Sequence, residues 1–179
     1  PTIINLTNHS YFNLEGQSSG SMLEQTLCLN ASTFTEGNAE TCPTGRILPV
    51  AGTPMDFTRA KPIGRDIQAE YSQLQMYDHN FILDKEPGML ALAAVARSEK
   101  TGITMETYTT QPGVQLYTSN SLQNDTRPGK TGGIYGRYQG FCLETQHYPC
   151  TPSHPEFPSV ELRPGEEYHE TTIYKFLTE

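Results

Sequence analysis

Short alternating segments dominate the hydrophobic pattern of this chain, and they predict β-strands joined by turns. Residues 114–118 alternate between apolar and polar side chains, and residues 89–97 and 103–110 together predict a β-hairpin. Further strands are expected at residues 22–31, 46–50, 140–147 and 171–177, and a short helix within 63–74. Frequent glycine, proline, threonine, serine and asparagine fit this interpretation. We therefore predict one all-β domain over residues 1–179, with a β-sandwich favoured over a barrel.

The chain opens with apolar residues that lead into a histidine. Residues 3–9 are expected to form a strand in which Ile4 and Leu6 share one face and His9 lies on the other. His9 would then lie on a polar face, close in sequence to the aromatic residues 11–12, where it could contact a polar ligand. The alternative is a histidine that only makes a hydrogen bond at the end of a strand.

Charge and composition narrow the classes of partner. The 179 residues carry a formal net charge of −8 at pH 7, which argues against nucleic acid and anionic membranes as partners. No apolar run approaches the ~20 residues of a membrane span, and no secretory signal is recognisable. The four cysteines lack CxxC or Cys/His ligand spacing, so they are interpreted as free thiols of a reducing compartment, the cytoplasm. A secreted protein with two disulfides is the alternative.

Glu144 is the acidic residue that the pattern singles out. In a strand, Cys142 and Glu144 share one face, while Leu143 lies on the other. A carboxylate in an otherwise apolar strand is costly unless it is paired or lies in a cleft, and burial would raise its pKa towards the range of a general base. The alternative is a glutamate that faces solvent on a half-exposed strand.

Two further residues extend the candidate site. Asp78 lies between Tyr77 and His79, where it could bind sugar hydroxyls, orient a histidine or cap a turn. Gln115 alternates with apolar neighbours and shares a strand face with Tyr117. Carboxylates, amides and aromatic rings that converge on one pocket suit a carbohydrate.

The sequence contains no Gly-rich phosphate loop, GxSxG elbow or HExxH motif, and we expect neither cofactor nor metal.

Six groups of residues carry a resemblance to a known family. They read NLTNHSYFNL at 5–14, PTG at 43–45 with VAGTP at 50–54, YDHN at 77–80, YTTQPGVQ at 108–115, GFCLETQ at 140–146 and LRPGE at 162–166. In these segments the chain resembles the aldose 1-epimerase (galactose mutarotase) family, with the motifs in family order. The resemblance implies an all-β supersandwich and the cofactor-free interconversion of the α and β anomers of free hexoses such as galactose or glucose.

The resemblance also implies roles for single residues. Glu144 would be the general base and His9 the general acid, while Asp78 and Gln115 would hold sugar hydroxyls. The match corresponds to the second half of the family's domain, and the family's Asn-Arg segment and another sugar-contacting histidine belong to the first half. We therefore expect a sandwich that is incomplete on its N-terminal side, with the N-terminal half as a partner that contributes to activity.

Three other functions fit parts of the pattern. A non-catalytic sugar-binding module would keep the pocket without needing an acid or a base. A hexose-6-phosphate epimerase would need arginines around a phosphate, and the arginines of this chain are scattered along the sequence. A glycoside hydrolase would use Asp78 and Glu144 as paired carboxylates, about 5 to 9.5 Å apart.

Overall fold

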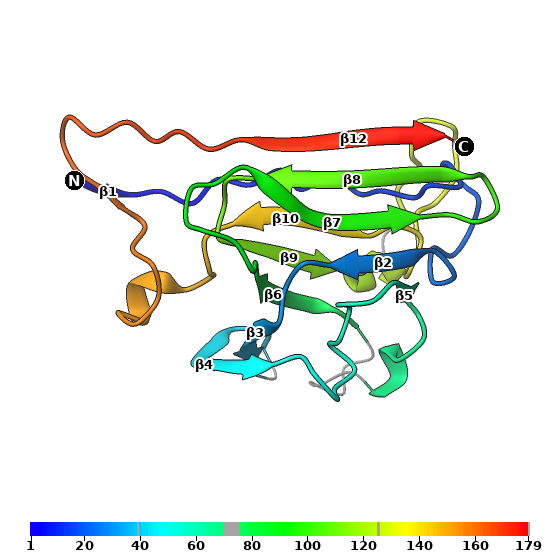
Figure 1. Cartoon of the computed structure of the whole chain (residues 1–179). Coiled ribbons are helices and arrows are strands. Elements are labelled where there is room, and N and C mark those ends of the chain that lie inside the picture. The colour runs from blue at the N-terminus through cyan, green and yellow to red at the C-terminus, as the bar shows by residue number, and fades with distance from the viewer. Residues whose placement is uncertain (39, 70–75, 125, 179) are drawn as a thin grey trace.

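A computed structural model describes residues 1–38, 40–69, 76–124 and 126–178 of the chain (Figure 1). The described residues form twelve β-strands and three short 3₁₀ helices. The strands are β1 (Thr2–Ile3), β2 (Thr26–Leu29), β3 (Thr33–Gly37), β4 (Pro43–Pro49), β5 (Lys61–Pro62), β6 (Asp78–Ile82), β7 (Ala91–Arg97), β8 (Ile103–Thr109), β9 (Gly113–Tyr117), β10 (Cys142–Gln146), β11 (Glu161–Leu162) and β12 (Thr172–Thr178). The helices are η1 (Ile67–Ala69), η2 (Asn120–Asn124) and η3 (Thr151–Ser153). The predicted all-β class is confirmed.

Two five-stranded antiparallel sheets make the body of the molecule. The first has the strand order β10-β9-β6-β3-β4, and the second has the order β12-β8-β7-β2-β5 (Figure 1). Alternate side chains of both sheets meet in one buried apolar core, to which Phe81, Val114 and Leu116 contribute from the first sheet and Leu27 and Met105 from the second. This is the predicted sandwich. The intervening residues of the first sheet face away from this core and are free to form a site.

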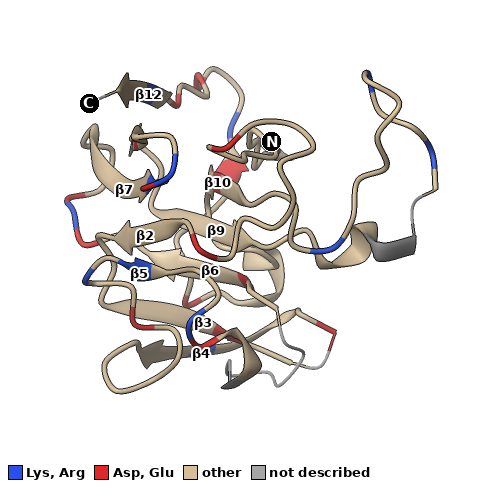
Figure 2. Ribbon diagram, turned by 90° about the vertical axis from the view of Figure 1, so that its right-hand side faces the viewer, with Lys and Arg blue, Asp and Glu red and all other residues tan. Residues whose placement is uncertain are grey.

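Charged residues lie mainly in loops and near strand ends, as the colouring of the ribbon in Figure 2 shows. β10 is an exception, because the red of an acidic residue lies within this strand (Figure 2). That residue is Glu144, the one acidic residue of β10. Among the described residues, no helix has the length and apolar character that crossing a membrane requires.

Two of the local predictions differ from the structure. The strand expected at residues 3–9 is wrong, since β1 ends at Ile3 and the following residues up to Tyr11 form no strand. Leu6 is exposed rather than buried, so the alternation that predicted a strand does not correspond to a buried face. The helix expected within 63–74 is limited to the single turn η1, and residues 70–75 lie outside the described part of the chain.

Candidate active site

Three adjacent strands of the first sheet place polar side chains in two neighbouring rows. Glu144 of β10 pairs with Gln115 of β9, and in the next row Tyr117 of β9 pairs with Asp78 of β6. Directly paired residues of an antiparallel sheet point to the same face. The sheet therefore brings Glu144, Gln115 and Asp78 together on the face turned away from the core.

His9 reaches this face from outside the sheet. The backbone of Phe12 forms an isolated antiparallel bridge with Phe141, just before β10, through hydrogen bonds of 2.8 and 2.9 Å. His9 lies three residues before Phe12, and Glu144 lies three residues after Phe141. Because the two backbones run antiparallel, this equal spacing brings His9 alongside Glu144. His9 Nε2 lies 3.5 Å from Glu144 Oε1, with the His9 side chain 51% exposed and the Glu144 side chain 10% exposed.

Asp78 and Gln115 form a second polar pair beside the first. Gln115 Nε2 donates a hydrogen bond of 2.8 Å to Asp78 Oδ1, which fixes the orientation of the amide. His79 is buried, and its Nδ1 accepts from the backbone N–H of Asp78 at 3.2 Å. The Asp78 carboxylate thus pairs with the glutamine, while its backbone N–H contacts the ring of His79.

All four predicted residues line one open cavity of about 660 Å³. That volume is typical of a small-molecule site. The Tyr11 ring stacks on the imidazole of His9 with centroids 5.1 Å apart, and the Tyr117 ring meets the same imidazole edge-on at 6.0 Å. The cavity is lined by His9, Tyr11, Met76, Asp78, Gln115, Tyr117, Asn120, Ser121, Arg137, Glu144 and Gln146. Carboxylates, an amide and aromatic rings thus face the same space.

Burial changes the acid–base properties of this cavity. Desolvation raises the pKa of Glu144, the nearby His9 charge lowers it in part, and the Asp78 carboxylate raises it further. Desolvation and the surrounding acidic groups raise the pKa of Tyr11 to about 12, so its hydroxyl stays neutral. A carboxylate with a raised pKa next to an imidazole is the arrangement that proton transfer near neutral pH requires.

The buried thiol of Cys142 completes the surroundings of His9. Cys142 Sγ lies 3.4 Å from His9 Nδ1, and desolvation raises the pKa of this thiol far above its usual range. The donor in this contact depends on the protonation of the imidazole, and Nε2 is the nitrogen that faces Glu144. Ligand atoms of His9, Cys142 and Glu144 lie within 4.8 Å of one another, so these are the described residues that could hold a metal ion.

The raised pKa of Glu144 predicts an effect on stability. A carboxyl with a higher pKa in the folded than in the unfolded state destabilises the fold at high pH. Its cost grows as pH rises from the unfolded-state pKa and is complete above the folded-state pKa. We expect Glu144→Gln to unfold at a higher temperature than the wild type at about pH 8. The difference should shrink near about pH 3.5, below the ordinary carboxyl pKa, where Glu144 is protonated in both states. Thermal unfolding followed by circular dichroism measures this, and a variant less stable than the wild type at pH 8 would contradict it.

Some cavity residues carry no signal in the sequence pattern. Arg137, Asn120 and Ser121 line the cavity from the chain between β9 and β10, where residues 118–141 contain no strand in the described part. Arg137 is held with its guanidinium carbon 4.6 Å from the centroid of the Tyr138 ring. Alternation cannot identify such residues, because loops have no period.

Comparison with known proteins identifies the family of the chain. The family model for aldose 1-epimerase matches residues 1–175. The chain is 45% identical to galactose mutarotase of Homo sapiens, over 98% of this chain and 50% of that protein. It is 37% identical to aldose 1-epimerase of Haemophilus influenzae, over 98% of this chain and 52% of that protein.

A solved structure gives the same result. The aldose epimerase homologue from C. elegans superposes with a TM-score of 0.84 at 32% identity, over 98% of this chain and 52% of that one. The chain belongs to the aldose 1-epimerase family, whose characteristic sandwich it shares. It spans about half the length of the relatives it matches.

Proposed function

We propose that this chain carries the acid–base pair of an aldose 1-epimerase that interconverts the α and β anomers of free hexoses such as galactose or glucose. The observation that carries the proposal is the His9–Glu144 contact of 3.5 Å in a cavity that Asp78 and Gln115 also line. The names of the relatives support the same reaction. A module that only binds sugar would need neither the base nor the acid.

The proposed chemistry transfers only protons between the protein and the sugar. The Glu144 carboxylate accepts the proton of the anomeric hydroxyl while His9 donates a proton to the ring oxygen, and the bond between C1 and the ring oxygen breaks. The open aldehyde turns about the C1–C2 bond, and the ring closes on the other face of the carbonyl. In that step the ring hydroxyl returns its proton to His9, and protonated Glu144 gives its proton to the new anomeric oxygen. Both groups end as they began, as a cycle requires.

We further propose that the chain corresponds to the second half of the epimerase domain and works with the remaining half. The chain spans half the length of its relatives, and β12 is an edge strand of the second sheet. Ile173 and Phe176 of β12 are exposed, as is Ile3 of β1. Exposed apolar side chains along a free sheet edge are typical of a surface that another segment covers.

Four free cysteines also support a location in a reducing compartment. We propose the cytoplasm on this basis. Such a location would keep the buried thiol of Cys142 reduced beside His9.

Polarimetry tests the proposed activity directly. Freshly dissolved α-D-galactose is followed with the chain alone, with a longer protein that supplies the remaining half, and with buffer. Faster mutarotation by either protein than by buffer supports the proposal, and the comparison of the two shows whether the remaining half is needed. A longer protein that binds galactose without accelerating mutarotation would overturn it in favour of a binding module.

Removal of the second polar pair should affect binding more than turnover. Asp78→Ala and Gln115→Ala are each expected to raise KM roughly 10- to 100-fold with kcat changed by less than about fivefold, because each removes hydrogen bonds to sugar hydroxyls without touching the proton-transfer pair. Asp84→Ala is the control, since Asp84 accepts a hydrogen bond of 2.8 Å from Ser32 away from the cavity. Initial rates over a range of galactose concentrations measure both constants, and a fall in kcat alone would contradict the assigned role.

A further inference from the structure

The segment that carries His9 lies beside β10 without forming a strand. β10 ends the strand order of the first sheet and pairs only with β9 there, so its other edge is open to the segment. The two are joined by backbone pairing at Phe12 and Phe141, as described above. This bridge fixes the segment at Phe12, after His9. The position of His9 also depends on how the segment is held before it.

The side chain of Asn5 holds that other end. Asn5 Oδ1 accepts a hydrogen bond of 3.0 Å from the backbone N–H of His147, and Asn5 Nδ2 donates one of 3.0 Å to the backbone carbonyl of the same residue. His147 directly follows β10. The carboxamide thus pairs with the extension of β10 as a strand residue would, but from one side-chain length away.

The two ties lie on either side of the catalytic pair. His9 lies four residues after Asn5 and three before Phe12, and Glu144 lies three residues before His147 and three after Phe141. The segment therefore has one more residue than the part of β10 that it spans. Residues 5–12 thus form an arc beside β10 that is tied to it at both ends.

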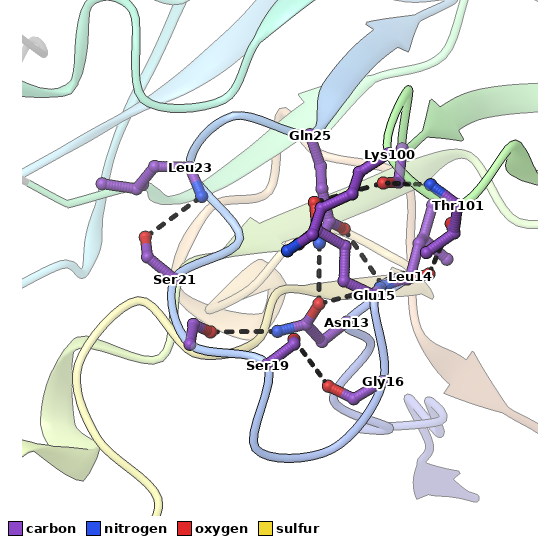
Figure 3. A network of polar contacts seen from close by, with 12 residues as sticks. Asn13, Leu14, Glu15, Gly16, Ser19, Ser21, Leu23, Gln25, Lys100 and Thr101 are labelled. Carbon is purple, nitrogen blue, oxygen red and sulfur yellow. Dashed lines mark hydrogen bonds and ion pairs between the residues drawn. The ribbon is translucent and has the colours of Figure 1, made fainter.

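The two ends of the arc are supported independently. At the Phe12 end, Asn13 Nδ2 donates to the carbonyls of Gly20 and Gln139 at 3.1 and 3.0 Å. Asn13 Oδ1 accepts from Gln25 Nε2 at 2.7 Å (Figure 3). Figure 3 shows this network around the turn that follows the segment. None of these contacts involves Asn5, so this end should keep its position when Asn5 is changed.

At the Asn5 end, Gln111 supports the same strand extension. Gln111 Nε2 donates to the Tyr168 hydroxyl at 3.0 Å and to the Leu6 carbonyl at 3.4 Å, so its Oε1 accepts from His147 Nδ1 at 2.9 Å. Desolvation lowers the pKa of His147, and the Glu170 carboxylate opposes this shift in part. His147 is thus a held residue to which Asn5 ties the arc.

We propose that Asn5 is a positioning residue that sets the separation between His9 and Glu144. This role rests on the proposed epimerase function. Asn5 is exposed, so water can take over its two hydrogen bonds when it is removed and the fold should lose little stability. The arc would lose its tie to the extension of β10 and keep the contacts of the Leu6 backbone with Gln111 and Tyr168. A small displacement of His9 is enough to slow proton transfer.

Asn5→Ala tests this role in whichever form of the protein is active by polarimetry. We expect kcat to fall roughly 10-fold or more, with KM changed by less than about threefold and the unfolding temperature nearly unchanged. Asn5→Asp provides a second variant, because it keeps an acceptor for the His147 N–H but has no donor for the His147 carbonyl. Its loss of kcat should be measurable and in the same direction.

Asn30→Ala is the matched control. Asn30 Nδ2 also donates to two backbone carbonyls, of Asp84 and Leu92, at 3.4 and 3.5 Å, and it lies outside the cavity. The control should keep the wild-type kcat. If Asn30→Ala loses as much kcat as Asn5→Ala, the effect of Asn5 is general rather than positional, and the inference is overturned.

A double substitution separates positioning from stability. If Asn5 acts through His9, adding Asn5→Ala to a His9→Asn protein should lower the residual kcat by less than about twofold, because the group that Asn5 positions is already missing. A full additional loss would overturn the inference, as would an Asn5→Ala protein with wild-type kcat. An inactive wild type in both forms would instead overturn the proposed function itself.

Discussion

Glu144→Gln is expected to lower kcat by roughly 10³- to 10⁴-fold while changing the affinity for galactose by less than about threefold. The substituted amide has nearly the shape of the carboxylate and keeps a hydrogen-bond acceptor, so the sugar can still bind. It cannot accept a proton at neutral pH, and ring opening cannot begin without removal of the anomeric proton. Polarimetric rates give kcat, and isothermal titration calorimetry gives the affinity.

Glu36→Gln is the control for this substitution. Glu36 of β3 is as buried as Glu144, with both residues 8% exposed, but it does not line the cavity. It pairs instead with Arg46, whose Nη1 lies 3.0 Å from Glu36 Oε1. Its substitution should lower stability and leave kcat unchanged. Near-normal kcat in the Glu144→Gln protein would exclude Glu144 as the base.

The loss of activity and the gain of stability expected for Glu144→Gln have one cause. Burial that raises the pKa of this carboxyl also makes its ionised form costly for the fold. A catalytic carboxylate that is largely buried therefore reduces stability at the pH where it works. A variant that lost activity without gaining stability at pH 8 would indicate that the charge is better solvated in the folded protein than its surroundings suggest.

The sequence predicts the side-chain directions of the site better than its assembly. Strands alternate with a period of two, so the placement of Glu144 opposite Leu143, and of Gln115 opposite its apolar neighbours, follows from local pattern. Which strands lie next to each other depends on contacts between distant parts of the chain. The pairing of Glu144 with Gln115 and of Asp78 with Tyr117 became visible only in the fold.

The segment before His9 shows where local pattern fails. Ile3, Ile4 and Leu6 favour an extended strand by composition. The hydrogen bonds of this segment go instead to the Val160 carbonyl, to the Tyr168 hydroxyl and, through the Asn5 side chain, to His147. None of these partners lies nearby in sequence, so no local rule could replace the predicted strand by the observed arc.

His9→Asn is expected to be the second most damaging substitution, with kcat lowered roughly 10²- to 10³-fold. The loss should be smaller than for Glu144→Gln, because half of the His9 side chain is exposed and water can protonate the ring oxygen slowly in its place. The variant should also change the pH dependence. The His9 charge lowers the pKa of Glu144, so its removal should raise that pKa and move the acidic limb of the kcat–pH profile to higher pH.

His154→Asn is the matched control for His9. His154 Nδ1 lies 3.3 Å from Glu156 Oε1, which gives a second histidine–glutamate pair, in the loop after β10 and outside the cavity. Its substitution should leave both kcat and the acidic limb unchanged. If His9→Asn lowers kcat but the acidic limb stays in place, Glu144 does not sense the charge of His9, and the two would not act as a coupled pair. If the limb moves and kcat stays near the wild-type value, the imidazole tunes the base, and another group protonates the ring oxygen.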